Sequence, residues 1–171
     1  MPLYKRAALG AEAGLLAGTG VALLFLIQDS VTLAPLSTPE ALASTLFGPV
    51  GYSMDDGLVA QAVGMAVYGF RLLSYTLLHF LAFALLGVGA AFALRGVSWL
   101  ASLGGGALYG LTACSAVFYG TRLVLESPVM LEQLGVPSVL IANVVAGTIM
   151  GGGLHLVSNP DGTASQDAVV P

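Results

Sequence analysis

The chain has 171 residues, of which 57% are hydrophobic and 8% are charged, with a formal net charge of −4. Soluble domains carry about 25% charged residues, so this composition excludes an ordinary water-soluble domain and favours a membrane protein. Its 5 Lys and Arg residues are too few to neutralise a run of phosphates, which excludes nucleic acid as a partner. The expected surroundings are a lipid bilayer.

The first predicted element is a transmembrane helix over residues 7–27, preceded by the basic pair Lys5 and Arg6. This stretch is longer than the hydrophobic region of a usual signal peptide, and no small-residue cleavage site follows it, so we expect an uncleaved span. Its one charged side chain, Glu12, is either a locally paired group or part of a proton or cation path. Glycines spaced by four share one helix face and predict close packing on another helix: Gly10, Gly14 and Gly18.

The connection over residues 28–57 has acidic residues and no basic one, which suits the non-cytoplasmic side. Within it, Thr38-Pro39-Glu40 predicts a helix start with a hydroxyl cap, a proline at the first position and an acid near the positive end of the dipole. We expect a short helix there, lying on the membrane surface or over the end of the bundle. The apolar residues 58–70 either extend the next span as one helix or lie in the interface with a bend at Gly69.

The second predicted span covers residues 72–94, an uncharged stretch between Arg71 and Arg95. At 1.5 Å per residue it reaches roughly 34 Å, enough to cross a hydrocarbon core of about 30 Å. His79 is its only strongly polar side chain at depth.

The third and fourth spans are predicted over residues 97–121 and 136–157. A second short helix is expected between them, over residues 129–134, and residues 158–171 have the polar composition of a disordered tail. In the third span Cys114 is expected to be a small buried residue. Side chains expected to line helix faces are Gly106 and Gly110 in the third span, and Asn143, Gly147, Gly151 and His155, which recur every fourth residue, in the fourth.

The predicted fold is therefore all-α: one polytopic domain over residues 1–157 with four transmembrane helices and short interfacial helices in the two outer loops. The basic residues Lys5, Arg6 and Arg95 favour the cytoplasm for both termini. We expect a multi-pass protein of the bacterial plasma membrane.

Three apolar segments resemble a family of uncharacterised bacterial four-helix integral membrane proteins. The matching segments are residues 36–46 (LSTPEALASTL), residues 75–80 (YTLLHF) with Phe83, and residues 143–151 (NVVAGTIMG). The resemblance implies a four-helix membrane architecture. It implies no activity and no site residues, because none is assigned to that family.

Four polar groups inside the spans are the candidate sites, namely Glu12, His79, Asn143 and His155. Glu12 and His155 are expected at similar depth, where they form either a structural polar cluster or a cluster that handles protons. His79 and Asn143 are also expected at similar depth, where they form a hydrogen bond between helices. The two histidines differ in depth by roughly 18 Å, so they cannot hold one haem between them. No cofactor or metal site is predicted, because no metal-ligand spacing, nucleophile elbow or phosphate loop occurs.

The sequence thus favours a non-enzymatic membrane protein, an accessory or assembly subunit that packs through its small-residue faces on other membrane subunits or on itself. The alternative is a small carrier or channel for protons or a solute, with Glu12, His79, Asn143 and His155 along the path. A third and weaker hypothesis is a haem-binding electron-transfer subunit that uses a single histidine or two copies of the chain.

Overall fold

The computed structural model describes residues 1–49, 57–94, 98–125, 132 and 134–158, and it is helical throughout these ranges apart from turns and helix ends. Four helical segments are long and apolar enough to cross a membrane, which confirms the predicted all-helical class and number of candidate spans. They are α1 (Leu3–Val31), α3 (Leu58–Ala93), the segment α4 (Trp99–Tyr109), η1 (Gly110–Cys114) and α5 (Ser115–Leu125), and α7 (Val136–Ser158); α2 (Ser37–Phe47) is a short helix between the first two.

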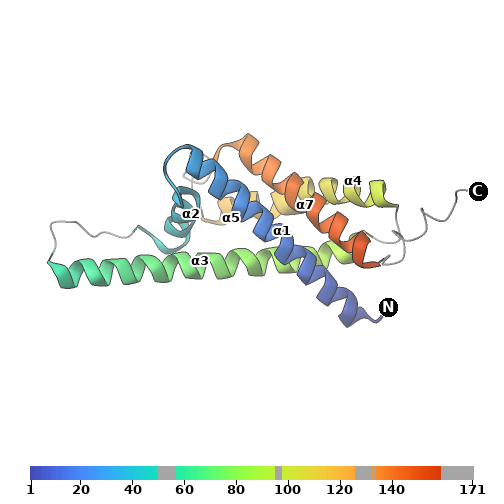
Figure 1. Cartoon of the computed structure of the whole chain (residues 1–171), viewed down its shortest axis with the longest axis horizontal. Helices are drawn as coiled ribbons and strands as arrows, with labels where there is room; N and C mark the ends of the chain where they lie inside the picture. The colour runs from blue at the N-terminus through green and yellow to red at the C-terminus, as the bar shows by residue number, and fades with distance from the viewer. Residues whose placement is uncertain (50–56, 95–97, 126–131, 133, 159–171) are drawn as a thin grey trace, which may run out of the picture.

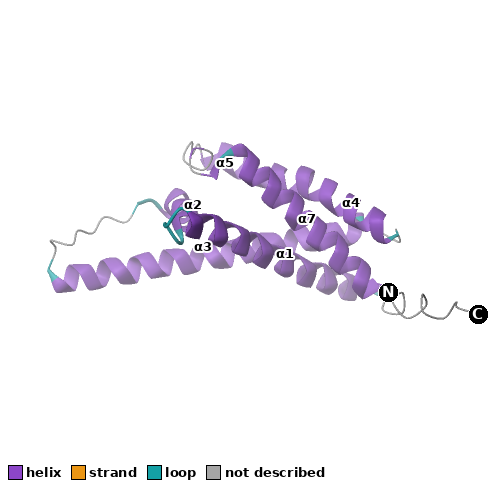
Figure 2. Ribbon diagram, turned by 45° about the horizontal axis from the view of Figure 1, so that its top comes forward, coloured by secondary structure: helices purple, strands orange, loops and turns teal. Residues whose placement is uncertain are grey.

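The long helices form one bundle in which α1 has two neighbours. It crosses α3 on one side and packs on α7 on the other, while α4 runs beside α7 (Figure 1). The N-terminus, the end of α3, the start of α4 and the end of α7 gather at one end of the bundle, as the turned view also shows (Figure 2).

The contact between α1 and α3 depends on glycine. A Cβ atom on Gly14 would overlap the carbonyl oxygen of Phe83, and one on Gly87 would overlap that of Gly10. Gly18 continues the same line against the rings of Phe83 and Phe80. The two backbones can approach this closely only because no side chain stands between them.

A second glycine contact joins α4 and η1 to α7. Cβ atoms on Gly106 and Gly110 would overlap the carbonyl oxygens of Gly147 and Asn143, and one on Gly147 would overlap that of Gly106. Gly151 approaches the backbone of α4 in the same way. The seven glycines expected to pack helices therefore all lie at contacts within the chain.

Between these contacts lies a core of small side chains. Ala17 of α1, Ala90 of α3, and Ala146 and Met150 of α7 have no exposed surface. Such packing brings helices together and excludes water. We call this part of the bundle, around residues 10–17, 84–91, 102–110 and 146–154, the closed half.

The short helix α2 covers the other end of the bundle and packs on α3. The predicted hydroxyl cap is wrong in its detail: the Thr38 hydroxyl does not cap α2 but donates to Asp29 Oδ1 at 2.8 Å, and Thr38 N donates to Asp29 Oδ2 at 2.8 Å. Asp29, in the last turn of α1, is 4% exposed. An acceptor from the preceding helix therefore caps α2 and holds it against the bundle.

The helices run past the predicted spans. α1 begins at Leu3 and ends at Val31, and α3 begins at Leu58, so residues 58–70 continue the helix without a bend at Gly69. With 36 residues α3 is roughly 54 Å long, and its first turns extend beyond the other helices (Figures 1 and 2). Of the predicted helix over residues 129–134 only Glu132 and Leu134 are described, both as helical, and the tail after Ser158 lies outside the described residues.

Candidate functional site

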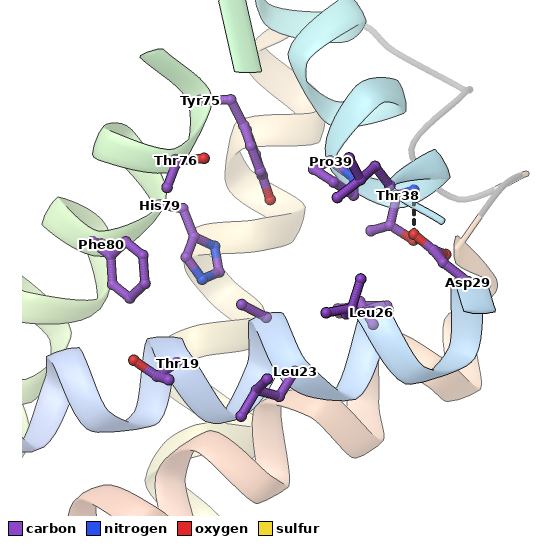
Figure 3. A pocket seen from close by; sticks show the side chains of 13 residues that line it. Thr19, Leu23, Leu26, Asp29, Thr38, Pro39, Tyr75, Thr76, His79 and Phe80 are labelled. Carbon is purple, nitrogen blue, oxygen red and sulfur yellow. Dashed lines mark hydrogen bonds between the residues drawn. The ribbon is translucent and has the colours of Figure 1, made fainter. Parts of the chain in front are cut away.

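Two cavities lie beyond the closed half, in the part of the bundle that α2 covers, and they share Tyr75 and His79 as lining residues. The α1-side cavity, of about 250 Å³, lies between α1, α2 and α3 (Figure 3). The α5-side cavity, of about 340 Å³, lies between α2, α3, α5 and α7. The volume of the α5-side cavity lies in the range of ordinary small-molecule sites, and that of the α1-side cavity lies just below it.

His79 lies on the side of α3 that faces α1, between the two cavities. Its Nε2 lies 3.1 Å from the carbonyl oxygen of Gly18. Because a carbonyl oxygen can only accept, Nε2 is the donor in this contact. The rings of Tyr75 and Phe83 pack on the imidazole, with centroids 5.9 and 4.8 Å away. Figure 3 shows the Tyr75 and His79 side chains extending from α3 into the space beside α1 and α2.

Asn143 approaches the α5-side cavity from α7. It is 8% exposed, and its Nδ2 donates to Ser115 Oγ at 2.9 Å. Ser115 directly follows the π-helical segment η1, whose first residue, Gly110, touches the backbone of Asn143. Short π-helical segments inside α-helices are frequent at functional sites.

The structure therefore brings two of the four candidate residues to one cavity. His79 and Asn143 both line the α5-side cavity, but the hydrogen bond expected between them is replaced by their bonds to Gly18 and Ser115. Glu12 and His155 do not line this cavity. His155 lies in the last turn of α7 with its ring against that of Trp99, at a centroid distance of 5.4 Å. The pairing of Glu12 with His155 stays a prediction.

Two groups at this site are not among the candidates chosen from the sequence. Tyr75 lies one turn from His79, and the i, i+4 spacing does predict that the two share a face of α3, but this spacing by itself indicates no chemistry. Asp29 carries no such local signal, because the helix that it caps begins after an intervening turn.

The α5-side cavity is mostly apolar although it contains His79, Asn143 and Cys114. The donors on His79 and Asn143 are turned to protein acceptors, and neither side chain is bonded to Cys114. These three residues are thus not arranged as a nucleophile with its base. Within the described ranges, no group of three or more His, Cys, Asp and Glu side chains could hold a metal ion.

Comparison of the chain with protein-family models, curated proteins and solved structures found no match. The resemblance to bacterial four-helix membrane proteins stays a prediction.

Proposed function

We propose that the chain is a non-enzymatic integral membrane protein that binds a small apolar or amphiphilic molecule in the α5-side cavity. The observation that supports this most is a cavity of about 340 Å³ with apolar walls and a few buried polar groups, beside a closed half that is closely packed. The proposal includes the bacterial plasma membrane as its location, with both termini in the cytoplasm.

A side chain that fills the cavity tests this proposal. Ala82 lines the cavity, whereas Leu81, beside it on α3, is 56% exposed and does not. Ala82→Trp should abolish the thermal stabilisation that apolar and amphiphilic compounds give to the purified protein, and Leu81→Trp should leave it intact. The proposal fails if no compound of a broad panel stabilises the parent protein, or if both variants respond alike.

A carrier is the version of this function in which the ligand crosses the membrane. The two cavities meet at His79, but the closed half beyond them is packed with Ala17, Ala90 and Ala146 at zero exposure. Transport therefore needs that half to open. In proteoliposomes His79→Ala and Glu12→Gln should abolish flux while the fold persists, and unchanged flux in both variants contradicts the carrier version.

An accessory subunit is the second candidate, and the first turns of α3 favour it. Leu58, Val59, Met65 and Phe70 are between 66% and 86% exposed on a helix that extends past the bundle. Exposed apolar surface of this kind is typical of interaction sites. The glycine faces no longer support this candidate, because all seven pack within the chain. Purification in mild detergent tests it: a single monomeric species without a co-purifying protein contradicts it.

A further inference from the structure

Two arginines, which do not themselves line the α5-side cavity, are each one helical turn from a residue that does. Arg71 is one helical turn from Tyr75 on α3, and Arg122 is one turn from Phe118 on α5; Tyr75 and Phe118 both line the cavity. On both helices the step from the lining residue to the arginine leads away from the closed half. Both cations therefore lie at the same end of the cavity.

Arg71 is buried and Arg122 is half-buried, and each has a buried Nε atom without a hydrogen-bond partner in the part of the chain that the structure describes. Arg71 is 9% exposed, and its Nη2 reaches the carbonyl oxygen of Ala43 on α2 at 3.4 Å, a long contact for a charged donor. Among the described acids, Asp29 is already bonded to Thr38.

Among the residues that the structure describes, no acid pairs with either guanidinium, and burying such a charge unpaired is costly because desolvation removes its water. Ionisable groups at membrane depth usually pair with a partner and mark a binding site or a path. An anion at the end of the cavity would supply that partner. Arginine matches planar anions such as carboxylates, because its fork donates two parallel hydrogen bonds.

The cavity beside the arginines is suited to an apolar chain. Two of its polar side chains direct their donors into the protein, His79 to Gly18 and Asn143 to Ser115. Most of the wall is therefore aliphatic or aromatic. The residues concerned include Leu42, Leu46, Leu78, Leu86, Val117 and Phe118.

We propose that the α5-side cavity takes a single-chain anionic amphiphile, for which a long-chain carboxylate is the simplest form, with its head at Arg71 and Arg122 and its tail among the leucines. This inference rests on the proposed binding function and specifies its ligand class. Side chains on a helix lean toward its N-terminus, which on α5 directs Arg122 toward the cavity, whereas on α3 it directs Arg71 away from the closed half and toward α2.

Photo-crosslinking tests the inference with the full chain in phosphatidylcholine nanodiscs. The probes are a diazirine-labelled palmitate and the matching hexadecanol, which differ only in the charge of the head. Peptides that line the cavity should react about tenfold more with the carboxylate, the preference expected for a charge-assisted hydrogen bond. Arg71→Gln and Arg122→Gln should each remove most of that preference, and Lys5→Gln, which removes an exposed cation at the other end, should not.

If Arg71→Gln fails to fold, two other variants still decide the test. Arg122→Gln should fold because Arg122 is only half buried, and Arg71→Lys should fold because lysine retains the positive charge. Equal labelling of the cavity by both probes, unaffected by the arginine variants, overturns the inference and leaves the proposed binding function standing. Absence of cavity labelling by either probe overturns both. If a lysophosphatidic acid probe displaces palmitate from the cavity and palmitate does not displace that probe, the cavity prefers a phosphate head and the choice of a carboxylate head is wrong.

Discussion

The closed half of the bundle and the half that α2 covers are made by the same helices but are packed by opposite means. In the closed half, glycine and alanine bring α1 onto α3 and α4 onto α7 at backbone contact. In the other half, which we call the open half, the same helices carry Tyr75, His79 and Phe118 around two cavities.

This difference shows how a bundle of four helices can be stable and still leave space for a candidate site. Backbone contact gives much van der Waals packing over a small area, so one half can hold the bundle together. The other half is then free to keep polar groups and space. The residues that matter for binding should therefore be nearly separable from those that matter for folding.

The largest loss of stability is expected when a methyl group is added to a glycine of the closed half. Gly147→Ala places a Cβ against the carbonyl oxygen of Gly106, and since both are backbone neighbours the helices must separate. We expect a loss of about 3 kcal/mol in the free energy of unfolding, the upper end for overpacking. Denaturation of the detergent-solubilised protein, followed by circular dichroism, measures it.

Gly104→Ala is the matched control on α4, because no atom lies within 4 Å of the added Cβ. It should leave stability unchanged or raise it by up to about 1 kcal/mol, since alanine is the better helix former. Equal losses in the two variants would mean that the α4–α7 contact does not carry the stability assigned to it.

An intermediate effect is expected where α2 is held over the open half. Asp29→Ala removes both acceptors of Thr38 and leaves the backbone N–H and the hydroxyl without a partner. Loss of a charged acceptor at a helix cap should reduce stability by about 2 kcal/mol. Limited proteolysis should then cleave α2 before the rest of the bundle.

Thr38→Val separates the two bonds in this cap. It keeps the backbone donor to Asp29 and removes only the hydroxyl, so it should have about half the effect, near 1 kcal/mol. Protease resistance of α2 in the Asp29→Ala variant would show that packing on α3, and not this cap, holds the helix.

Hydrophobic length and glycine spacing were enough to predict the helical class, the number of candidate spans and the glycines at their contacts. An uncharged stretch between Arg71 and Arg95 and glycines at every fourth position are local signals, and the four candidate spans and their glycine contacts follow from them. Helix ends were less accurate, because α1 and α3 continue until a turn or cap stops them and not where the apolar stretch ends.

The candidate site could be predicted only in part. His79 and Asn143 stand out in the sequence as polar groups in apolar spans, and they do reach one cavity. Their partners could not be predicted, because Gly18 offers a backbone carbonyl and Ser115 follows a π-helical segment that shifts the helix face. The sequence predicts Arg71 only as the end of a span, because no local pattern shows that its guanidinium reaches the carbonyl oxygen of Ala43 on α2.

The smallest effects should come from matched interhelical hydrogen bonds, one in each half. Ser102 Oγ donates to the carbonyl oxygen of Gly151 at 2.8 Å in the closed half, and Asn143 Nδ2 donates to Ser115 Oγ in the open half. Ser102→Ala and Asn143→Ala should each reduce stability by only about 0.6 kcal/mol, the average for such bonds between membrane helices. The two variants should differ in binding instead, because only Asn143 lines the α5-side cavity. If Ser102→Ala weakened ligand binding as much as Asn143→Ala does, packing and binding would be coupled across the bundle, and the division into two halves would be wrong.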